Sequence, residues 1–203
     1  MIDRQRQPLD VVGRTRELQE IVANFGLEER PHPVTLASGG QSRFFVDAKQ
    51  ALASGNHLRV ACELIVHLAA KDAPTWNAVG GMTMGADPLA HGVSLLTGRS
   101  WFTVRKEPKG RGSNKLIEAV AMSSDTLVLL IDDVVTMGGS IRRAYEAVVK
   151  DGATVLLATA LVDRGDTARR FFDDIGVPYK PLLTYEDLGI PPVELELPTA
   201  ASL

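Results

Sequence analysis

Two adjacent carboxylates, Asp132 and Asp133, precede a glycine-rich turn at residues 136–140. Residues 127–131 are continuously apolar, which is typical of a parallel strand covered on both faces. Apolar residues then recur across 141–149 with the spacing of a half-buried helix. The acids and the turn are therefore expected at the junction of a buried strand and a helix.

The turn is suited to binding a phosphate group. A helix N-terminus presents unpaired N–H groups and a partial positive charge, and glycines let the backbone close around an anion. The second residue of the turn needs only its backbone N–H, so its side chain can point away. The turn consists of Thr136, Met137, Gly138, Gly139 and Ser140.

The two acids would repel a phosphate unless another group lay between them. A ribose ring fits this place, because carboxylates accept hydrogen bonds from a vicinal diol while the 5′-phosphate reaches the turn. A divalent cation would neutralise the remaining charge, and Mg²⁺ is usual with phosphates. A solvated turn is the plain alternative, since Asp and Gly are common in turns. The coincidence of strand, acids, hydroxyls, glycines and helix favours a sugar-phosphate site.

These residues need a sheet to hold them. Strands are predicted at 76–80, 100–104, 127–131 and 154–162, with helical spacing between them. This alternation predicts an α/β fold with a parallel sheet and crossover helices. Ligands of such folds bind beyond the carboxyl ends of the strands. The polar residues at those ends are Arg105 and Lys106, Asp132 and Asp133, and Asp163 and Arg164.

The composition narrows the class of protein. The chain has 203 residues, 45% of them hydrophobic, which is compatible with one domain and a buried core. A net charge of −3 argues against general nucleic-acid binding. The single cysteine, Cys62, cannot form an internal disulfide. Neither a signal peptide nor a membrane-length apolar stretch is seen, so a cytoplasmic protein without a membrane partner is expected.

The segment LVLLIDDVVTMGGS (127–140) resembles the phosphoribosyl pyrophosphate (PRPP) signature of the type I phosphoribosyltransferases. Four more segments resemble orotate phosphoribosyltransferases in the family's order. These are a base-binding segment at 35–52, a pyrophosphate loop at 79–90, a mobile catalytic loop at 102–119 and a strand ending in a base-contacting Arg at 160–166.

The resemblance implies the type I phosphoribosyltransferase fold, a parallel twisted sheet flanked by helices with a small hood. Residues 1–203 would form a single domain. Its core would span about 55–166, and its hood about 1–50 and 167–203. The implied activity is transfer of the phosphoribosyl group from PRPP to orotate, giving orotidine 5′-monophosphate and pyrophosphate.

The resemblance also implies roles for individual residues. The implied catalytic residues are Lys109, Asp132 and Asp133. The implied base-binding residues are Phe44, Phe45, Thr136 and Arg164. Mg²⁺ would be held through PRPP and water, with the two acids as outer ligands. PRPP binding is implied for Arg105, Lys106, Lys109, Arg111, Asp132, Asp133, Thr136, Met137, Gly138, Gly139 and Ser140.

Residues 105–115 contain five cations, two glycines and no large apolar residue. Such a segment cannot be held by burial, so it should be mobile. Closure of a cationic loop over pyrophosphate would neutralise developing charge and exclude water. A solvated basic loop is the alternative. In the family this loop serves the neighbouring subunit's site, which implies a homodimer.

Two aromatic residues and one arginine could contact the base. Phe44 and Phe45 must point to opposite faces if they lie in a strand, so one enters the core and the other, or the backbone, could cover the base. Arg164 could bind a pyrimidine carboxylate in two-pronged geometry. A surface ion pair is the alternative for Arg164.

The chain departs from the family pattern near the base. Ala37 replaces a common Lys, and Arg111 replaces a usual His that, unlike Arg, can titrate near neutral pH. A phosphoribosyltransferase for a different base, or a PRPP-sensing regulator without catalysis, therefore remains an alternative.

Overall fold

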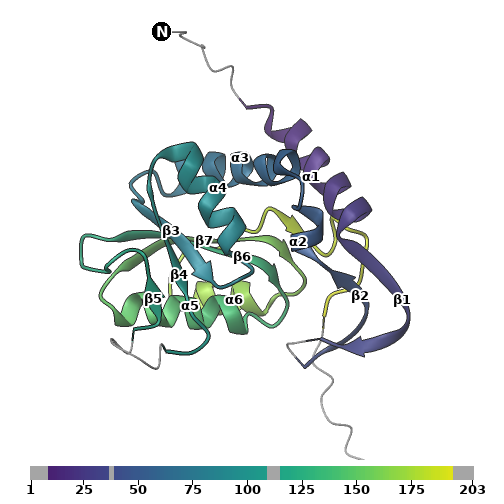
Figure 1. Cartoon of the computed structure of the whole chain (residues 1–203). Coiled ribbons are helices and arrows are strands. Elements are labelled where there is room, and N and C mark those ends of the chain that lie inside the picture. Colours follow the sequence, from purple (N-terminus) through teal and green to yellow (C-terminus); the bar gives the residue numbers. More distant parts are fainter. Residues whose placement is uncertain (1–8, 37–38, 109–114, 194–203) are drawn as a thin grey trace, which may run out of the picture.

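A six-stranded sheet forms the centre of the computed structural model, which describes residues 9–36, 39–108 and 115–193 (Figure 1). The strand order is β5-β4-β3-β6-β7-β8. All neighbouring strands are parallel except β5, which runs antiparallel to β4. The bounds are β3 Ala78–Met82, β4 Ser100–Val104, β5 Ile117–Glu118, β6 Leu127–Val135, β7 Thr154–Asp163 and β8 Leu183–Thr184.

The four predicted strands exist, but β6 is longer than the apolar run suggested. Its pairing with β7 continues to Val135, so Asp132 and Asp133 lie within the strand rather than after it. The extension arises because Val134 and Val135 pair with Val162 and Asp163 of the neighbouring strand. The acids are therefore held by a sheet ladder.

Helices cover both faces of the sheet, as expected for parallel strands. On one face lie α1 Val11–Phe25, α3 Gly55–Asp72 and α4 Asp87–Thr97, and on the other lie α5 Gly139–Lys150 and α6 Thr167–Asp174. Because strand side chains alternate, Leu129 and Ile131 of β6 join the first cluster. Val128 and Leu130 join the second.

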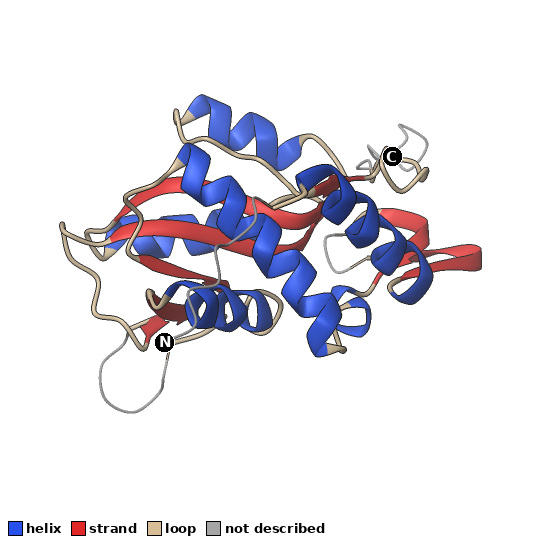
Figure 2. Ribbon diagram, turned by 90° about the horizontal axis from the view of Figure 1, so that it is seen from above, coloured by secondary structure: helices blue, strands red, loops and turns tan. Residues whose placement is uncertain are grey.

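A hairpin and a short helix form a small second layer. β1 Leu27–Thr35 and β2 Gln41–Val46 pair antiparallel, and α2 Ala48–Ala51 follows. Figure 2 shows this hairpin projecting at one end of the molecule, beyond the main sheet. It corresponds to part of the expected N-terminal hood.

The C-terminal part of the expected hood lies differently. We expected all of 167–203 there. Residues 194–203 lie outside the described residues. Within 167–193, α6 packs on α5, and β8 pairs with β7 in the main sheet. The cause is burial of Phe172 and Tyr179, whose rings stack with centroids 5.3 Å apart in the second core cluster.

Within the described ranges, no helix is both long and apolar enough to cross a membrane.

Candidate active site

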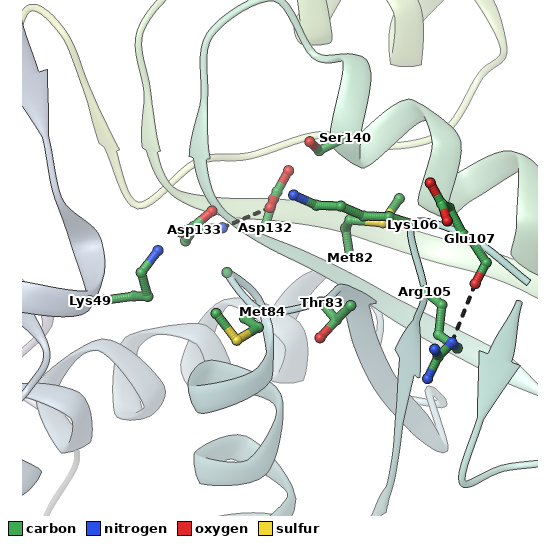
Figure 3. A pocket seen from close by; sticks show the side chains of 11 residues that line it. Lys49, Met82, Thr83, Met84, Arg105, Lys106, Glu107, Asp132, Asp133 and Ser140 are labelled. Carbon is green, nitrogen blue, oxygen red and sulfur yellow. Dashed lines mark hydrogen bonds between the residues drawn. The ribbon is translucent and has the colours of Figure 1, made fainter. Parts of the chain in front are cut away.

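The carboxyl ends of three neighbouring strands surround a pocket of about 710 Å³ (Figure 3). β3 continues into the loop at 82–86, Arg105 and Lys106 follow β4, and β6 carries the two acids. This is the sheet edge that the sequence predicted. The pocket is lined by Lys49, Met82, Thr83, Met84, Gly85, Arg105, Lys106, Glu107, Asp132, Asp133 and Ser140.

The adjacent acids occupy different environments. Asp132 is only 3% exposed and accepts a hydrogen bond of 3.0 Å from the backbone N–H of Asp133. Burial, and then the nearby Asp133 charge, raise the pKa of Asp132 well above its ordinary value. Asp133 is partly exposed. Both line the pocket, so their carboxylates are available to a sugar ring.

The turn after β6 borders a second hollow of about 350 Å³. Its lining includes all five predicted residues, 136–140, together with Asp132, Lys106 and Arg143. The first backbone bond of α5 runs from Arg142 N–H to the Gly138 carbonyl (3.0 Å), so the preceding N–H groups have no helical acceptor. Gly138 has φ +72°, a left-handed conformation that favours glycine. The arrangement suits an anion.

The loop at 82–86 packs directly against the acids. A Cβ atom on Gly85 would contact the Asp133 carboxylate, so a glycine is needed for this approach. Gly80 and Gly81 are buried within the sheet, and added Cβ atoms would meet the backbone of Phe102 and Ile131. Those two glycines therefore serve strand packing.

Arg105 and Lys106 point in different directions. The Arg105 guanidinium donates to Glu118 (3.2 Å) and to the Glu107 carbonyl (3.3 Å). Figure 3 shows Lys106 extending across the pocket toward Asp132. Lys106 is thus the cation of this pair that faces the acids. Lys109 and Arg111, which were also predicted to bind PRPP, lie outside the described residues.

A third hollow of about 210 Å³ adjoins the main pocket and is lined by three of the four predicted base-binding residues. Phe45 lines it and is 36% exposed, whereas Phe44 packs against the core. The two rings thus take opposite faces, as the strand geometry required. Thr136 and Arg164 also line this hollow, which we call the base hollow.

Arg164 is 1% exposed, and its terminal nitrogens are engaged by β2. They donate to the Phe44 carbonyl (2.6 Å) and to the Ser42 hydroxyl (3.2 Å). Burial lowers the pKa of Arg164. In this arrangement Arg164 holds the hairpin against the sheet. It does not form a surface ion pair, which was the alternative interpretation of this residue from the sequence.

Two residues at the site were not predicted from the sequence. Lys49 lies on α2 and lines the main pocket. Asp87, at the start of α4, does not line the pocket but accepts hydrogen bonds from Thr83 and Thr103 beside it. The Asp87-Pro88 pair, with proline in the first helical turn, was an available signal for α4. Nothing local marked Lys49, because its position depends on how the hairpin packs.

A metal would need ligands beyond the protein. Across 9–36, 39–108 and 115–193, no cluster of three or more His, Cys, Asp or Glu residues could hold a metal ion directly. The donors near the pocket are the two adjacent acids and Glu107. Such a set fits a hydrated cation that is carried mainly by a phosphate ligand.

Known proteins resemble this chain in sequence and in fold, although no protein-family profile matches it. The orotate phosphoribosyltransferase of Methanothermobacter thermautotrophicus is 34% identical over 174 residues, which cover 86% of this chain and 93% of that protein. A phosphoribosyltransferase structure from Corynebacterium diphtheriae has a TM-score of 0.74 and 31% identity, covering 88% of this chain and 99% of its own.

A Mycobacterium tuberculosis orotate phosphoribosyltransferase structure was determined in complex with PRPP. It has a TM-score of 0.71 and 30% identity, and it covers 87% of this chain and 99% of its own. The similarity therefore extends over nearly the whole length of these relatives. This chain belongs to the orotate phosphoribosyltransferase family.

Proposed function

We propose that this protein transfers the phosphoribosyl group of PRPP to a ring nitrogen of orotate, which releases pyrophosphate and forms orotidine 5′-monophosphate. One observation carries this proposal. Asp132 and Asp133 line a pocket of about 710 Å³ together with Lys106 and Ser140, and Asp132 and Lys106 also line the hollow of the turn at 136–140. Relatives that bear the orotate phosphoribosyltransferase name support the choice of base.

The proposed mechanism is mainly positioning and electrostatics. The turn at 136–140 holds the 5′-phosphate, and the two acids accept hydrogen bonds from the ribose hydroxyls. As the bond between C1′ and the pyrophosphate oxygen breaks, its electron pair leaves with pyrophosphate, and positive charge develops on the ribose. Asp132 and Asp133 offset this charge. The ring nitrogen then bonds to C1′ and releases its proton to solvent.

The leaving group needs positive charge on the opposite side. Lys106 supplies part of it, and Lys109 and Arg111 are proposed to add to it from the loop at 105–115. Mg²⁺, bound through PRPP and water with the two acids as outer ligands, would neutralise the diphosphate. We further propose a homodimer in which this loop serves the partner's site. The highly charged donor does not cross membranes, so a cytoplasmic location is proposed with it.

The test is pyrophosphate release from PRPP and Mg²⁺ with a panel of bases. We expect release with orotate and none with uracil, adenine or hypoxanthine, with orotidine 5′-monophosphate identified by mass. If pyrophosphate is released with another base and not with orotate, that base is the acceptor. PRPP binding without turnover of any base would indicate a regulator. Asp132→Asn serves as the inactive control.

A further inference from the structure

Lys49 lies where three hollows meet. It lines the main pocket, the base hollow and a further hollow of about 210 Å³ beside Gly85 and Pro88. Asp133 is the only other residue that lines all three among those described. Figure 3 shows Lys49 across the pocket from Lys106, with its ammonium directed toward Asp133.

The backbone of Lys49 is firmly placed. The Asp47 carboxylate caps α2 by accepting hydrogen bonds from the N–H groups of Lys49 (3.0 Å) and Gln50 (3.1 Å). Ala48 and Ala51 of the same helix are buried in the core. The Lys49 side chain therefore projects from an anchored element toward the hollows.

The Lys49 side chain is exposed and uncommitted. Among the described residues it has no ion-pair partner, whereas Arg105 at the same pocket pairs with Glu118. An ammonium carries three N–H donors and no acceptor. Lys49 thus presents an available positive charge to whatever occupies the base hollow.

The base hollow has few other cations. Arg164 is the second cation in its described lining, and the terminal nitrogens of Arg164 already donate to Phe44 and Ser42. A buried guanidinium held in this way contributes positive potential but does not offer an open two-pronged face. A carboxylate entering the hollow would still need a mobile donor, and Lys49 supplies one.

We propose that the Lys49 ammonium binds the carboxylate of the acceptor base and thereby selects orotate over uracil, which lacks this group. This inference rests on the proposed function. The base carboxylate is preferred over pyrophosphate as the target because Lys106 and Arg105 line the main pocket but not the base hollow, which Lys49 does line. On the base side, Lys49 is the exposed cation within the described lining.

The experiment compares two nucleotides that differ only in the carboxylate, orotidine 5′-monophosphate and uridine 5′-monophosphate. Calorimetry gives the Kd of each for wild type, Lys49→Met, Lys49→Arg and Lys71→Met. We expect Lys49→Met to raise the Kd for orotidine 5′-monophosphate roughly 10- to 100-fold, which is the effect of losing a charge-assisted hydrogen bond. Binding of uridine 5′-monophosphate and of pyrophosphate should be unchanged. Lys71 is exposed near the end of α3, away from the hollows, so Lys71→Met should behave as wild type.

Lys49→Arg keeps the charge and should retain most of the preference for the carboxylate. An unchanged ratio of the two nucleotide affinities in Lys49→Met would overturn the inference. The inference would also be overturned if Lys49→Met bound pyrophosphate more weakly while the ratio of the two nucleotide affinities stayed the same. That result would mean that Lys49 contacts the leaving group. The proposed function is judged separately, by orotate turnover in the wild type. A wild type that turns over orotate while Lys49→Met keeps the ratio refutes only the role of Lys49.

Discussion

Thr103 on β4 donates a hydrogen bond of 2.8 Å to the carboxylate of Asp87 at the start of α4. The other oxygen of Asp87 accepts a bond of 2.7 Å from Thr83 in the loop after β3. One carboxylate therefore joins the loop at 82–86 to β4, which Arg105 and Lys106 follow. Residues of the loop line the main pocket together with Arg105 and Lys106.

Asp87→Ala should weaken PRPP binding and lower stability. The two threonine hydroxyls lose their acceptor, and a partly buried polar group without a partner costs about 1–3 kcal/mol of unfolding free energy. We expect a higher KM for PRPP with little change in the KM for orotate, measured by steady-state kinetics, and a lower urea midpoint. Thr103→Val removes one of the two bonds and should give a smaller change of the same kind. An Asp87→Ala enzyme with wild-type KM for PRPP would exclude this positioning role.

Asp132→Asn should raise stability at neutral pH while abolishing turnover. The folded-state pKa of Asp132 is above its unfolded value, so folding favours the protonated form. Stability from this group is present below the ordinary pKa and is lost as pH rises through the raised folded pKa. An uncharged Asn avoids that loss, so its Tm should exceed that of wild type at pH 7 and the difference should shrink in acid.

The same substitution removes a charge that offsets the developing positive charge on the ribose. Turnover should fall by about 100-fold or more. Asp133→Asn is the matched comparison, because Asp133 is more exposed and its replacement should change stability less. A Tm of Asp132→Asn below that of wild type at pH 7 would contradict the assigned cost of the buried charge.

Gly85→Ala should impair catalysis more than stability. The new Cβ atom meets the end of the Asp133 side chain, which can move, so the strain is relieved by displacing the carboxylate that we propose binds the ribose. A displacement of about 1 Å can cost up to about 100-fold in rate. Gly55→Ala is the control, since its Cβ meets nothing within 4 Å and Ala favours the helix that begins there. Equal activity of the two variants would show that Asp133 tolerates the shift.

Lys106→Ala should lower kcat more than Arg105→Ala does. Lys106 extends toward Asp132, whereas Arg105 is held by Glu118 in a partly exposed pair of small energetic value. We expect kcat to fall by roughly 10-fold or more in Lys106→Ala and by less than about 5-fold in Arg105→Ala. Stopped-flow or steady-state pyrophosphate release measures both. The reverse order would mean that Arg105 leaves Glu118 when PRPP binds.

Local patterns predicted much of this fold. The run at 127–131, the paired glycines and the helical spacing after them gave β6, the turn and α5, because each signal is contained in a few adjacent residues. α6 was missed because half of its residues are charged, and only the packing of Phe172 against Tyr179 and Tyr145 reveals its buried side.

The amino-acid sequence by itself determined the chemical groups of the site and the sheet edge at which they gather, since strand ends and turns follow from local periodicity. The tertiary structure decided the environment of those groups. Asp132 is buried because β6 pairs with β7 beyond the apolar run, and Arg164 is engaged by Phe44, 120 positions away in the chain. Burial and long-range hydrogen bonds depend on elements that are distant in sequence, so no local pattern specifies which cation stays available.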